Sequence, residues 1–279
     1  MRRLHTDPLA TPMESAASHT SQVLSAPGPI RWTSAARSHT GLVREINEDA
    51  CLERPELGLW AVADGMGGHA LGEFASRLAI RSLIDLPAPR SLEQYVDDAH
   101  ERLQAANRRL RAEAALRDVP VIGTTIVALL ASGRQGAYLW AGDSRIYLCR
   151  AGRLKQLTRD HSQVEAARSR RHRSSDDTLH RPPANLITRA LGAEDTLEID
   201  RATVEVVDGD VFLLCSDGLS NEVSELAIEQ ALLPGNCPQA CQALIDLALQ
   251  RGGHDNVTAV VVRAEDLYSP DRTAMHPVL

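Results

Sequence analysis

Aromatic residues are scarce in this chain of 279 residues, because Phe, Trp and Tyr together make up only 3% of it. Apolar residues still make up 43%, so the core must be built from Ala, Leu, Val and Ile. Lysine is scarcer still: Lys155 is the only one, and all other basic residues are arginines. The net charge of −7 argues against binding nucleic acid through overall charge, and so few aromatics offer little stacking surface for bases.

Cysteine is also infrequent, with five scattered residues and no C-x-x-C pair. Neither a zinc knuckle nor a disulfide framework is therefore predicted. No apolar run reaches the ~18 residues that a membrane span requires. The N-terminus carries two arginines but lacks the apolar stretch of a secretory signal. From these absences we expect a soluble, cytoplasmic protein.

The ends of the chain differ in composition from its middle. Residues 1–30 are rich in Ser, Thr, Pro and Ala without hydrophobic periodicity, which predicts a disordered leader. A loose C-terminal tail is expected over residues 267–279. No linker or repeat interrupts the part between them, which predicts one domain over residues 31–266. Within it, residues 159–184 are polar and break the pattern of strands.

The hydrophobic pattern of the domain mixes strand-like and helical segments. Strands are predicted at residues 31–39, 50–53, 58–63, 123–132, 136–141, 145–149, 153–157, 197–206, 210–215 and 256–263. Helices are predicted at residues 70–86, 91–116, 222–233 and 237–251. Strand runs mixed with paired helices, without strict alternation of strand and helix, predict an α+β fold with helices packed on antiparallel sheets.

Carboxylates recur where the apolar strands stop. Asp64 follows the apolar run 59–63, and three of the four residues after it are glycines. The same arrangement of strand end, acid and glycine recurs along the chain, and the acids concerned are Glu48, Asp49, Asp64, Asp143, Asp217 and Asp255. Carboxylates gathered at buried strand ends repel one another and take up protons unless a cation neutralises them. Oxygen ligands without His or Cys favour Mg²⁺ or Mn²⁺ over zinc.

Such a cluster suits phosphoryl chemistry. Two divalent ions about 4 Å apart can bridge and acidify a water for attack on phosphorus. An arginine can grip phosphoryl oxygens through two hydrogen bonds, and Arg44, four residues before Glu48, fits that role. The alternative on the residues alone is that each acid belongs to a tight turn and that Arg44 is a surface strand residue.

Eight short motifs occur in a fixed order along the chain. They are R-x-x-N-E-D (44–49), V-A-D-G-M-G-G (62–68), G-T-T (123–125), G-D-S-R (142–145), L-T-x-D-H-S (157–162), I-T-R-A-L-G (187–192), S-D-G-L (216–219) and D-N-V-T (255–258). Together they resemble the metal-dependent protein phosphatases, the protein phosphatase 2C family, in its bacterial stand-alone form. The resemblance extends over about residues 31–264.

The resemblance implies a fold and a set of metal ligands. The fold is a four-layer sandwich, in which two central antiparallel β-sheets are flanked by pairs of α-helices. Asp64 resembles the ligand that bridges both ions, and Gly65 offers its carbonyl oxygen. Asp217 and Asp255 resemble ligands that complete the shell of the other ion. The glycines after Asp64 would clear space around it.

The remaining site residues follow in the same way. Glu48 and Asp49 resemble residues that hold metal-bound waters, and Arg44 resembles the phosphate anchor. Asp143 is a possible ligand of a third metal. Residues 159–184 resemble the flap beside the active site. Its arginines are candidates for substrate recognition or for a merely solvated loop, and they are Arg168, Arg170, Arg171 and Arg173.

Two positions depart from the family pattern. Animal members place a histidine, thought to be the general acid, two residues after the bridging aspartate, where this chain has Met66. Bacterial relatives often carry an aspartate four residues after the S-D pair, where this chain has Asn221. We therefore expect two well-bound ions and a third that is weak or absent.

The predicted function is metal-dependent hydrolysis of phosphoserine and phosphothreonine in proteins, with Mn²⁺ or Mg²⁺ as the cofactor. The expected partners are phosphorylated proteins and a cognate Hanks-type serine/threonine kinase, whose action the enzyme reverses. No nucleic acid, no membrane span and a monomeric state are expected. The alternative is a catalytically inactive phosphoprotein-binding module on the same fold.

Overall fold

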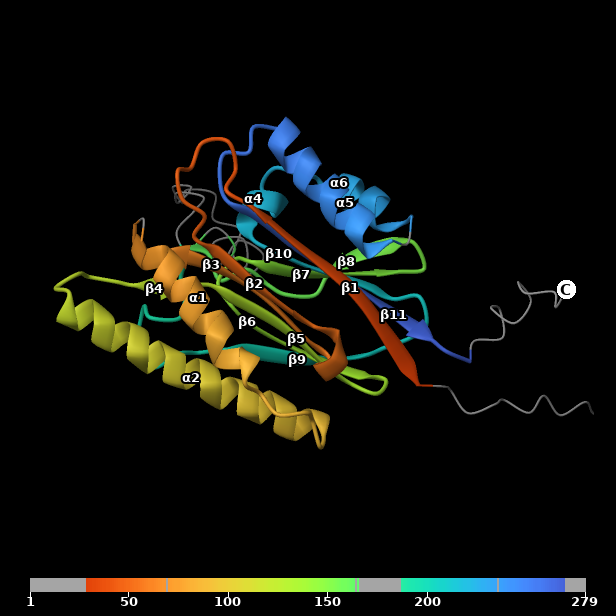
Figure 1. Ribbon diagram of the computed structural model, residues 1–279, viewed down its shortest axis with the longest axis horizontal. Helices are drawn as coiled ribbons and strands as arrows, with labels where there is room; N and C mark the ends of the chain where they lie inside the picture. The colour runs from red at the N-terminus through yellow and green to blue at the C-terminus, as the bar shows by residue number, and fades with distance from the viewer. Residues whose placement is uncertain (1–28, 69, 164, 166–186, 235, 269–279) are drawn as a thin grey trace, which may run out of the picture.

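The computed structural model describes residues 29–68, 70–163, 165, 187–234 and 236–268. Two antiparallel β-sheets pack face to face, and helices cover the outer face of each sheet (Figure 1). This arrangement confirms the predicted α+β sandwich of four layers. Most of the expected leader, the tail and the flap lies outside the described residues, including Arg168, Arg170, Arg171 and Arg173, and Ile30 of the expected leader begins β1.

The first sheet has five strands in the order β1-β11-β10-β7-β8. Their bounds are β1 Ile30–His39, β11 Val257–Asp266, β10 Val211–Cys215, β7 Arg145–Arg150 and β8 Arg153–Gln156. The helices on its outer face are α4 (Asp217–Ser220), α5 (Glu225–Leu232) and α6 (Cys237–Gln250), as Figure 1 shows. Each neighbouring pair of strands is antiparallel.

The second sheet runs in the order β2-β3-β5-β6-β9, and β4 pairs with the end of β3. Their bounds are β2 Asp49–Arg54, β3 Leu59–Met66, β4 Gly123–Thr124, β5 Ile126–Ser132, β6 Gln135–Ala141 and β9 Asp200–Glu205. The short 3₁₀ helix η1 (Pro55–Leu57) joins β2 to β3. The outer face of this sheet is covered by α1 (Ala70–Ile84) and α2 (Leu92–Leu116), the orange and the yellow helix in Figure 1.

The central strands are buried on both faces. In β3, Leu59, Ala61 and Ala63 pack in the core shared with α1 and α2. The alternate residues Trp60 and Val62 pack in the core between the two sheets. Because successive strand residues point to opposite faces, a strand with helices on one side and a sheet on the other reads as a continuous apolar run. This explains why the sequence shows apolar runs and not polar alternation.

The predicted elements are present, with differences at their ends. β3 continues past the predicted end at residue 63, because Gly65 and Met66 pair with Thr124 and Gly123 of β4. The predicted strand 123–132 is interrupted at Thr125, which separates β4 from β5. The helix predicted at 222–233 is α5, preceded by the separate turn of α4. None of the helices in the described part of the chain is both long and apolar enough to cross a bilayer.

Candidate metal centre

The predicted acidic residues come from both sheets and meet at one end of the sandwich. Asp64 in β3 is the register partner of Asp49, the first residue of β2. Asp217 lies two residues after the end of β10 and begins α4, while Asp255 lies two residues before β11. Asp143 lies in the turn between β6 and β7. The negative charges of Asp49, Asp143, Asp217 and Asp255 act on Asp64, so the structure brings these five predicted acids into one electrostatic cluster.

The backbone of Asp64 is fixed by two threonines. Its N–H donates to Thr125 Oγ1 at 3.0 Å. Its carbonyl oxygen accepts from the Thr125 N–H at 2.8 Å and from Thr124 Oγ1 at 2.9 Å. All of the backbone hydrogen-bonding capacity of Asp64 is thus used to hold its position, while the carboxylate faces the other acids. Both threonines belong to the G-T-T motif at residues 123–125.

Gly65 is required by close packing of the backbone. A Cβ atom at this position would lie 2.1 Å from the carbonyl oxygen of Gly72 in α1 and 2.7 Å from the carbonyl oxygen of Glu48. The Gly65 N–H donates to that same Glu48 oxygen at 3.1 Å. The space left by the missing side chain is therefore filled by the start of α1 and by the 44–49 loop, which brings Glu48 beside Asp64.

Asp49 is buried in a hydrogen-bonded network. Its Oδ2 accepts from Ser216 Oγ at 2.8 Å and from Thr258 Oγ1 at 2.6 Å. Its Oδ1 accepts no hydrogen bond from the described residues. Ser216 also accepts the N–H of Thr258 at 3.0 Å, which joins β10 to β11. The network orients the carboxylate and leaves one oxygen available for a further donor or cation.

Asn256 positions the loop that carries Glu48. Its Oδ1 accepts the Glu48 N–H at 2.8 Å. Its Nδ2 donates to the carbonyl oxygens of Thr40 and Ile46 at 2.8 and 2.9 Å. Sequence reasoning did not single out Asn256, Ser216 or Thr258, although the S-D-G-L and D-N-V-T motifs contain them. Their role depends on contacts between segments that are distant in the sequence.

The cluster is electrostatically strained without a cation. Burial, followed by the charges of Asp49 and the other acids, raises the pKa of Asp64 well above its ordinary value. Burial and the charge of Asp217 raise the pKa of Asp143 to about 7. The pKa values of Asp49 and Asp217 are raised as well, in both cases mainly by burial. Carboxylates in this state must bind either protons or a metal ion.

The donor set fits hard divalent ions. Asp49 Oδ1 and Asp143 Oδ1 are buried and accept no hydrogen bond from any described residue. Among the described residues between 29 and 268, no three Asp, Glu, His or Cys side chains lie close enough together to form a complete metal site by themselves. Oxygen ligands combined with water suit Mg²⁺ and Mn²⁺, which retain part of their hydration shell. The residues therefore fit a partly hydrated Mg²⁺ or Mn²⁺ site better than a closed structural one.

Arg44 lies at the exposed edge of the cluster. Its Nη2 donates to Asp255 Oδ2 at 2.8 Å, and its side chain is 51% exposed. The hydrogen bond to Asp255 and the charges of Asp255, Glu48 and Asp64 together raise the pKa of Arg44. Among the described residues its hydrogen-bond partner is Asp255, so the guanidinium keeps further N–H groups for an anion that approaches from solvent.

The turn that carries Asp143 is braced by His161. The Gly142 N–H donates to His161 Nδ1 at 3.2 Å, and the His161 N–H donates to the Gly142 carbonyl at 2.8 Å. The ring stacks on Trp140 and lies 3.2 Å from Asp200 Oδ2 through Nε2. Gly142 has φ +115°, a conformation that favours glycine. These contacts make His161 a structural support of the turn.

Asn221, the second departure from the family pattern, lies one turn after Asp217. Its Nδ2 donates to Asp217 Oδ2 at 3.1 Å. The amide thus occupies one oxygen of a candidate ligand and adds no negative charge. Met66, the first departure, ends β3 and is half-buried. Its thioether carries no proton to donate.

Comparison with known proteins identifies the family. The model of the protein phosphatase 2C family matches residues 36–239. The chain belongs to the protein phosphatase 2C family. The bacterial serine/threonine phosphatase class predicted from the eight motifs is thereby confirmed.

Two relatives show how far the similarity extends. The chain is 37% identical over 246 residues to the serine/threonine protein phosphatase PstP of Mycobacterium tuberculosis. These residues make up 88% of this chain and 47% of PstP. The chain therefore spans about half the length of that relative. It is 35% identical over 236 residues to the serine/threonine phosphatase Stp of Listeria welshimeri, covering 81% of this chain and 93% of Stp.

Solved structures agree with the fold. PppA, described as a key regulatory component of T6SS in Pseudomonas aeruginosa, is 46% identical with a TM-score of 0.79, covering 84% of this chain and 97% of that one. The catalytic domain of PstP in complex with two manganese ions is 38% identical with a TM-score of 0.75, covering 85% of this chain and all of that one. The expected use of two divalent ions is thus confirmed at the level of the family.

Proposed function

We propose that this chain hydrolyses phosphoserine and phosphothreonine in proteins with Mn²⁺ or Mg²⁺ as cofactor. The observation that carries the proposal is the cluster of Asp49, Asp64, Asp143, Asp217 and Asp255, with Arg44 at its exposed edge. An all-oxygen donor set with raised pKa values suits hard divalent ions, and an arginine beside it suits a phosphoryl group. Family membership gives the reaction class.

The proposed ligands are Asp64, Asp217, Asp255 and the Gly65 carbonyl, with Glu48 and Asp49 acting through water. When bound, two divalent ions supply an acidified water for attack on phosphorus. The Thr124 and Thr125 hydrogen bonds keep Asp64 in place, and Ser216 and Thr258 do the same for Asp49. Such fixed positions lower the cost of reorganisation during the reaction.

Arg44 is proposed to bind two phosphoryl oxygens of the substrate. Its contact with Asp255 aims the guanidinium at the cluster, where the phosphorus of a bound substrate must lie. Met66 cannot protonate the leaving alkoxide, so that proton comes from water in this proposal. Asp143 remains a proposed ligand for a third, weak ion.

The proposed partners are phosphorylated proteins and a Hanks-type kinase whose products the enzyme dephosphorylates. The similarity to PppA favours a dedicated regulatory pathway such as control of type VI secretion. A monomer, a cytoplasmic location, the disordered leader and tail, and a substrate role for the arginines of residues 159–184 stay predictions. Sedimentation and cell fractionation test the monomer and the location directly.

Turnover with a phosphothreonine peptide tests the proposal. We expect release of phosphate that needs millimolar Mn²⁺ or Mg²⁺ and stops with EDTA. Arg44→Ala should chiefly raise KM with a smaller fall in kcat, because ground-state and transition-state binding are lost together. Arg37→Ala, an exposed arginine in β1, is the matched control and should leave both constants unchanged.

The inactive binding module makes the opposite prediction. Such a protein would bind the phosphopeptide, with weaker binding in Arg44→Ala, but would release no phosphate at any Mn²⁺ concentration. Full activity in metal-free buffer would instead refute the proposed role of the carboxylates.

A further inference from the structure

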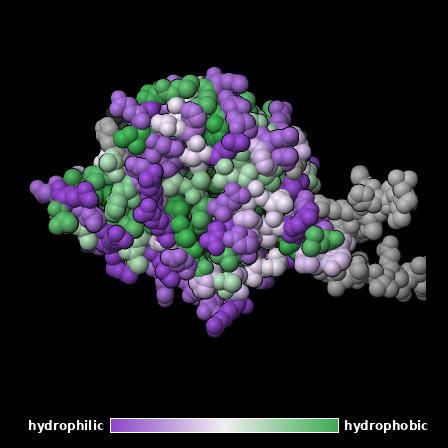
Figure 2. All heavy atoms as spheres, viewed as in Figure 1, coloured by the Kyte–Doolittle hydropathy of each residue, from purple (hydrophilic) through white to green (hydrophobic). Residues whose placement is uncertain are grey.

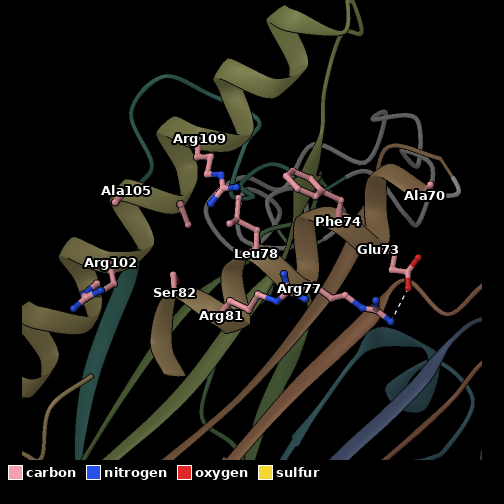
Figure 3. A pocket seen from close by; sticks show the side chains of 11 residues that line it. Ala70, Glu73, Phe74, Arg77, Leu78, Arg81, Ser82, Arg102, Ala105 and Arg109 are labelled. Carbon is pink, nitrogen blue, oxygen red and sulfur yellow. Dashed lines mark ion pairs between the residues drawn. The ribbon is translucent and has the colours of Figure 1, made fainter. Parts of the chain in front are cut away.

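A groove with basic walls lies between α1 and α2, on the outer side of the second sheet (Figure 3). Its volume is about 500 Å³. Arg77 and Arg81 stand on the α1 side, and Arg102 and Arg109 stand on the α2 side. All four side chains belong to exposed residues. The groove takes no part in the proposed metal centre.

The spacing of the arginines follows from helix geometry. Arg77 and Arg81 are four residues apart, and Arg102 and Arg109 are seven apart, so each pair lies on one face of its helix. Two antiparallel helices that turn these faces toward each other form two facing rows of cations. Figure 3 shows Leu78 and Ser82 between the rows.

The floor of the groove is apolar, with small residues on the α2 side. Ala105 and Ala106 lie between the two arginines of α2, and Phe74 and Leu78 contribute from α1. Larger side chains at the alanine positions would fill the space between the helices. Figure 2 shows hydrophilic and hydrophobic residues mixed over the viewed face of the molecule.

Most of this positive charge is not neutralised locally. Arg77 pairs with Glu73 at 2.6 Å. Within the described part of the chain, no ion pair or side-chain hydrogen bond joins Arg81, Arg102 or Arg109 to an acid. Three unpaired arginines in one concave site stand out in a chain whose net charge is −7. Such a site attracts anionic groups.

We propose that this groove docks an acidic segment of a partner protein, with carboxylate or phosphoryl groups on the arginines and apolar side chains on the floor. Seven residues of α2 span about 10 Å, which matches one to two turns of an amphipathic acidic helix. A nucleic acid would leave the aliphatic floor unused, and a flat lipid surface would not enter a groove between helices. The chain's own leader carries two arginines, one aspartate and one glutamate, so it lacks the charge of this occupant.

The groove ends beside the candidate metal centre. Ala70 lines its end, and Gly72, two residues further along α1, packs against Gly65. A docked partner would therefore extend from the α1–α2 face toward the carboxylate cluster. The binding test does not use turnover, so it stands or falls independently of the proposed phosphatase activity.

The test measures binding of a fluorescein-labelled peptide of about twelve residues built from Glu-Glu-Leu-Glu repeats, by fluorescence anisotropy with the full chain. Arg81→Glu combined with Arg102→Glu should weaken binding at least tenfold. The matched control reverses two exposed charges on β8, Arg153→Glu with Lys155→Glu, and should change binding less than about twofold. Binding should also weaken as salt rises.

Equal weakening in the two double variants, or no measurable binding to the unmodified chain, would overturn the proposal. So would tighter binding of a single-stranded DNA of equal charge, or of vesicles with anionic lipids. Sedimentation tests whether the groove binds a second copy of this chain. A dimer that is lost in the α1–α2 variant but kept in the β8 variant would show that another copy occupies the groove and would also overturn the proposal. Circular dichroism of each variant confirms folding.

Discussion

Two Asp-Gly pairs follow buried strands, one in each sheet, and they fold differently. After Asp64-Gly65 the strand β3 continues to Met66, because β4 supplies hydrogen-bonding partners. After Cys215 the strand β10 ends, and Asp217-Gly218 begins the single turn of α4. Both glycines approach a backbone carbonyl: a Cβ at either position would lie 2.1 Å from one, that of Gly72 or that of Asn256.

The comparison teaches what the repeated motif specifies. In both cases the aspartate stays at the end of the sandwich, and the glycine lets a second segment pack against it. The segment that packs there differs: β4 pairs with Gly65 and Met66, whereas Asp255 and Asn256, just before β11, pack against Gly218. Asp64 is held through its backbone N–H and carbonyl by two threonines, whereas Asp217 accepts hydrogen bonds from Asn221 at both its carbonyl and its carboxylate.

The largest expected effect separates the two aspartates. Asp64→Asn should lower kcat by several orders of magnitude, because the proposed bridging charge is lost from both ions. Asp217→Asn should lower kcat less and raise the Mn²⁺ concentration for half-maximal rate, since it contacts one ion in the proposal. Turnover of p-nitrophenyl phosphate against Mn²⁺ measures both. Indistinguishable kcat values and titrations would contradict the bridging role of Asp64.

The two glycines should be equally intolerant of a side chain. Gly65→Ala and Gly218→Ala should each destabilise the fold by about 1–3 kcal/mol, because the new Cβ meets backbone and not a movable side chain. The control is Gly136→Ala in β6, where the nearest atom is Val204 Cγ1 at 3.0 Å. Urea unfolding should show a smaller effect there. A larger loss in the control would show that overpacking does not explain these positions.

The carboxylate cluster predicts how stability depends on pH without metal. Raised pKa values mean that the folded chain binds more protons than the unfolded chain between the ordinary aspartate range and about 7. The melting temperature of the metal-free protein should therefore fall by several degrees from about pH 5 to about pH 8. Mn²⁺ replaces the protons, so its stabilising effect should grow with pH.

Calorimetry at several pH values, with EDTA or with Mn²⁺, measures this dependence. Asp143→Asn should flatten the metal-free slope, because it removes one carboxylate whose pKa is about 7. Asp85→Asn, an exposed carboxylate after α1, is the control and should leave the slope unchanged. If the melting temperature rises over the same pH range, the clustered carboxylates do not repel one another in the folded protein, and the prediction is wrong.

The smallest expected effect concerns Asn221. Asn221→Asp adds a charge beside Asp217 and should lower the Mn²⁺ concentration for half-maximal rate by a few fold, because affinity for hard cations follows the number of charged ligands. Asn221→Ala removes the hydrogen bond without adding charge and serves as the comparison. Identical titration curves for all three proteins would mean that Asn221 has no part in metal binding.

Local pattern was sufficient to predict most of the fold. Apolar runs placed the strands, and the spacing of apolar residues placed α2 within one residue at its start. The predicted strand boundaries are wrong where contacts with distant segments determine the end of a strand. β3 runs on through Gly65 because of β4, and Thr125 leaves the strand because its N–H and hydroxyl bind Asp64. Neither contact has a signature within a few residues of sequence.

The site was predictable in its acids but not in its supports. Asp64 and Asp217 stood out because a charged residue rarely ends an apolar run, and Asn256 did not because an asparagine there is compatible with an ordinary turn. The basic groove was missed for a different reason. Arg77 and Arg81 are visible as a helical pair, but only the packing of α1 against α2 places Arg102 and Arg109 opposite them.

The position of Lys155 has a practical consequence. It is exposed on β8, the edge strand of the first sheet, and the sequence contains no other lysine. Amine-reactive reagents would therefore modify one side chain besides the N-terminal amine. A single dye or a surface tether attached through Lys155 would sit on the opposite sheet from α1 and α2. Single-molecule and immobilised assays could thus leave that face unmodified.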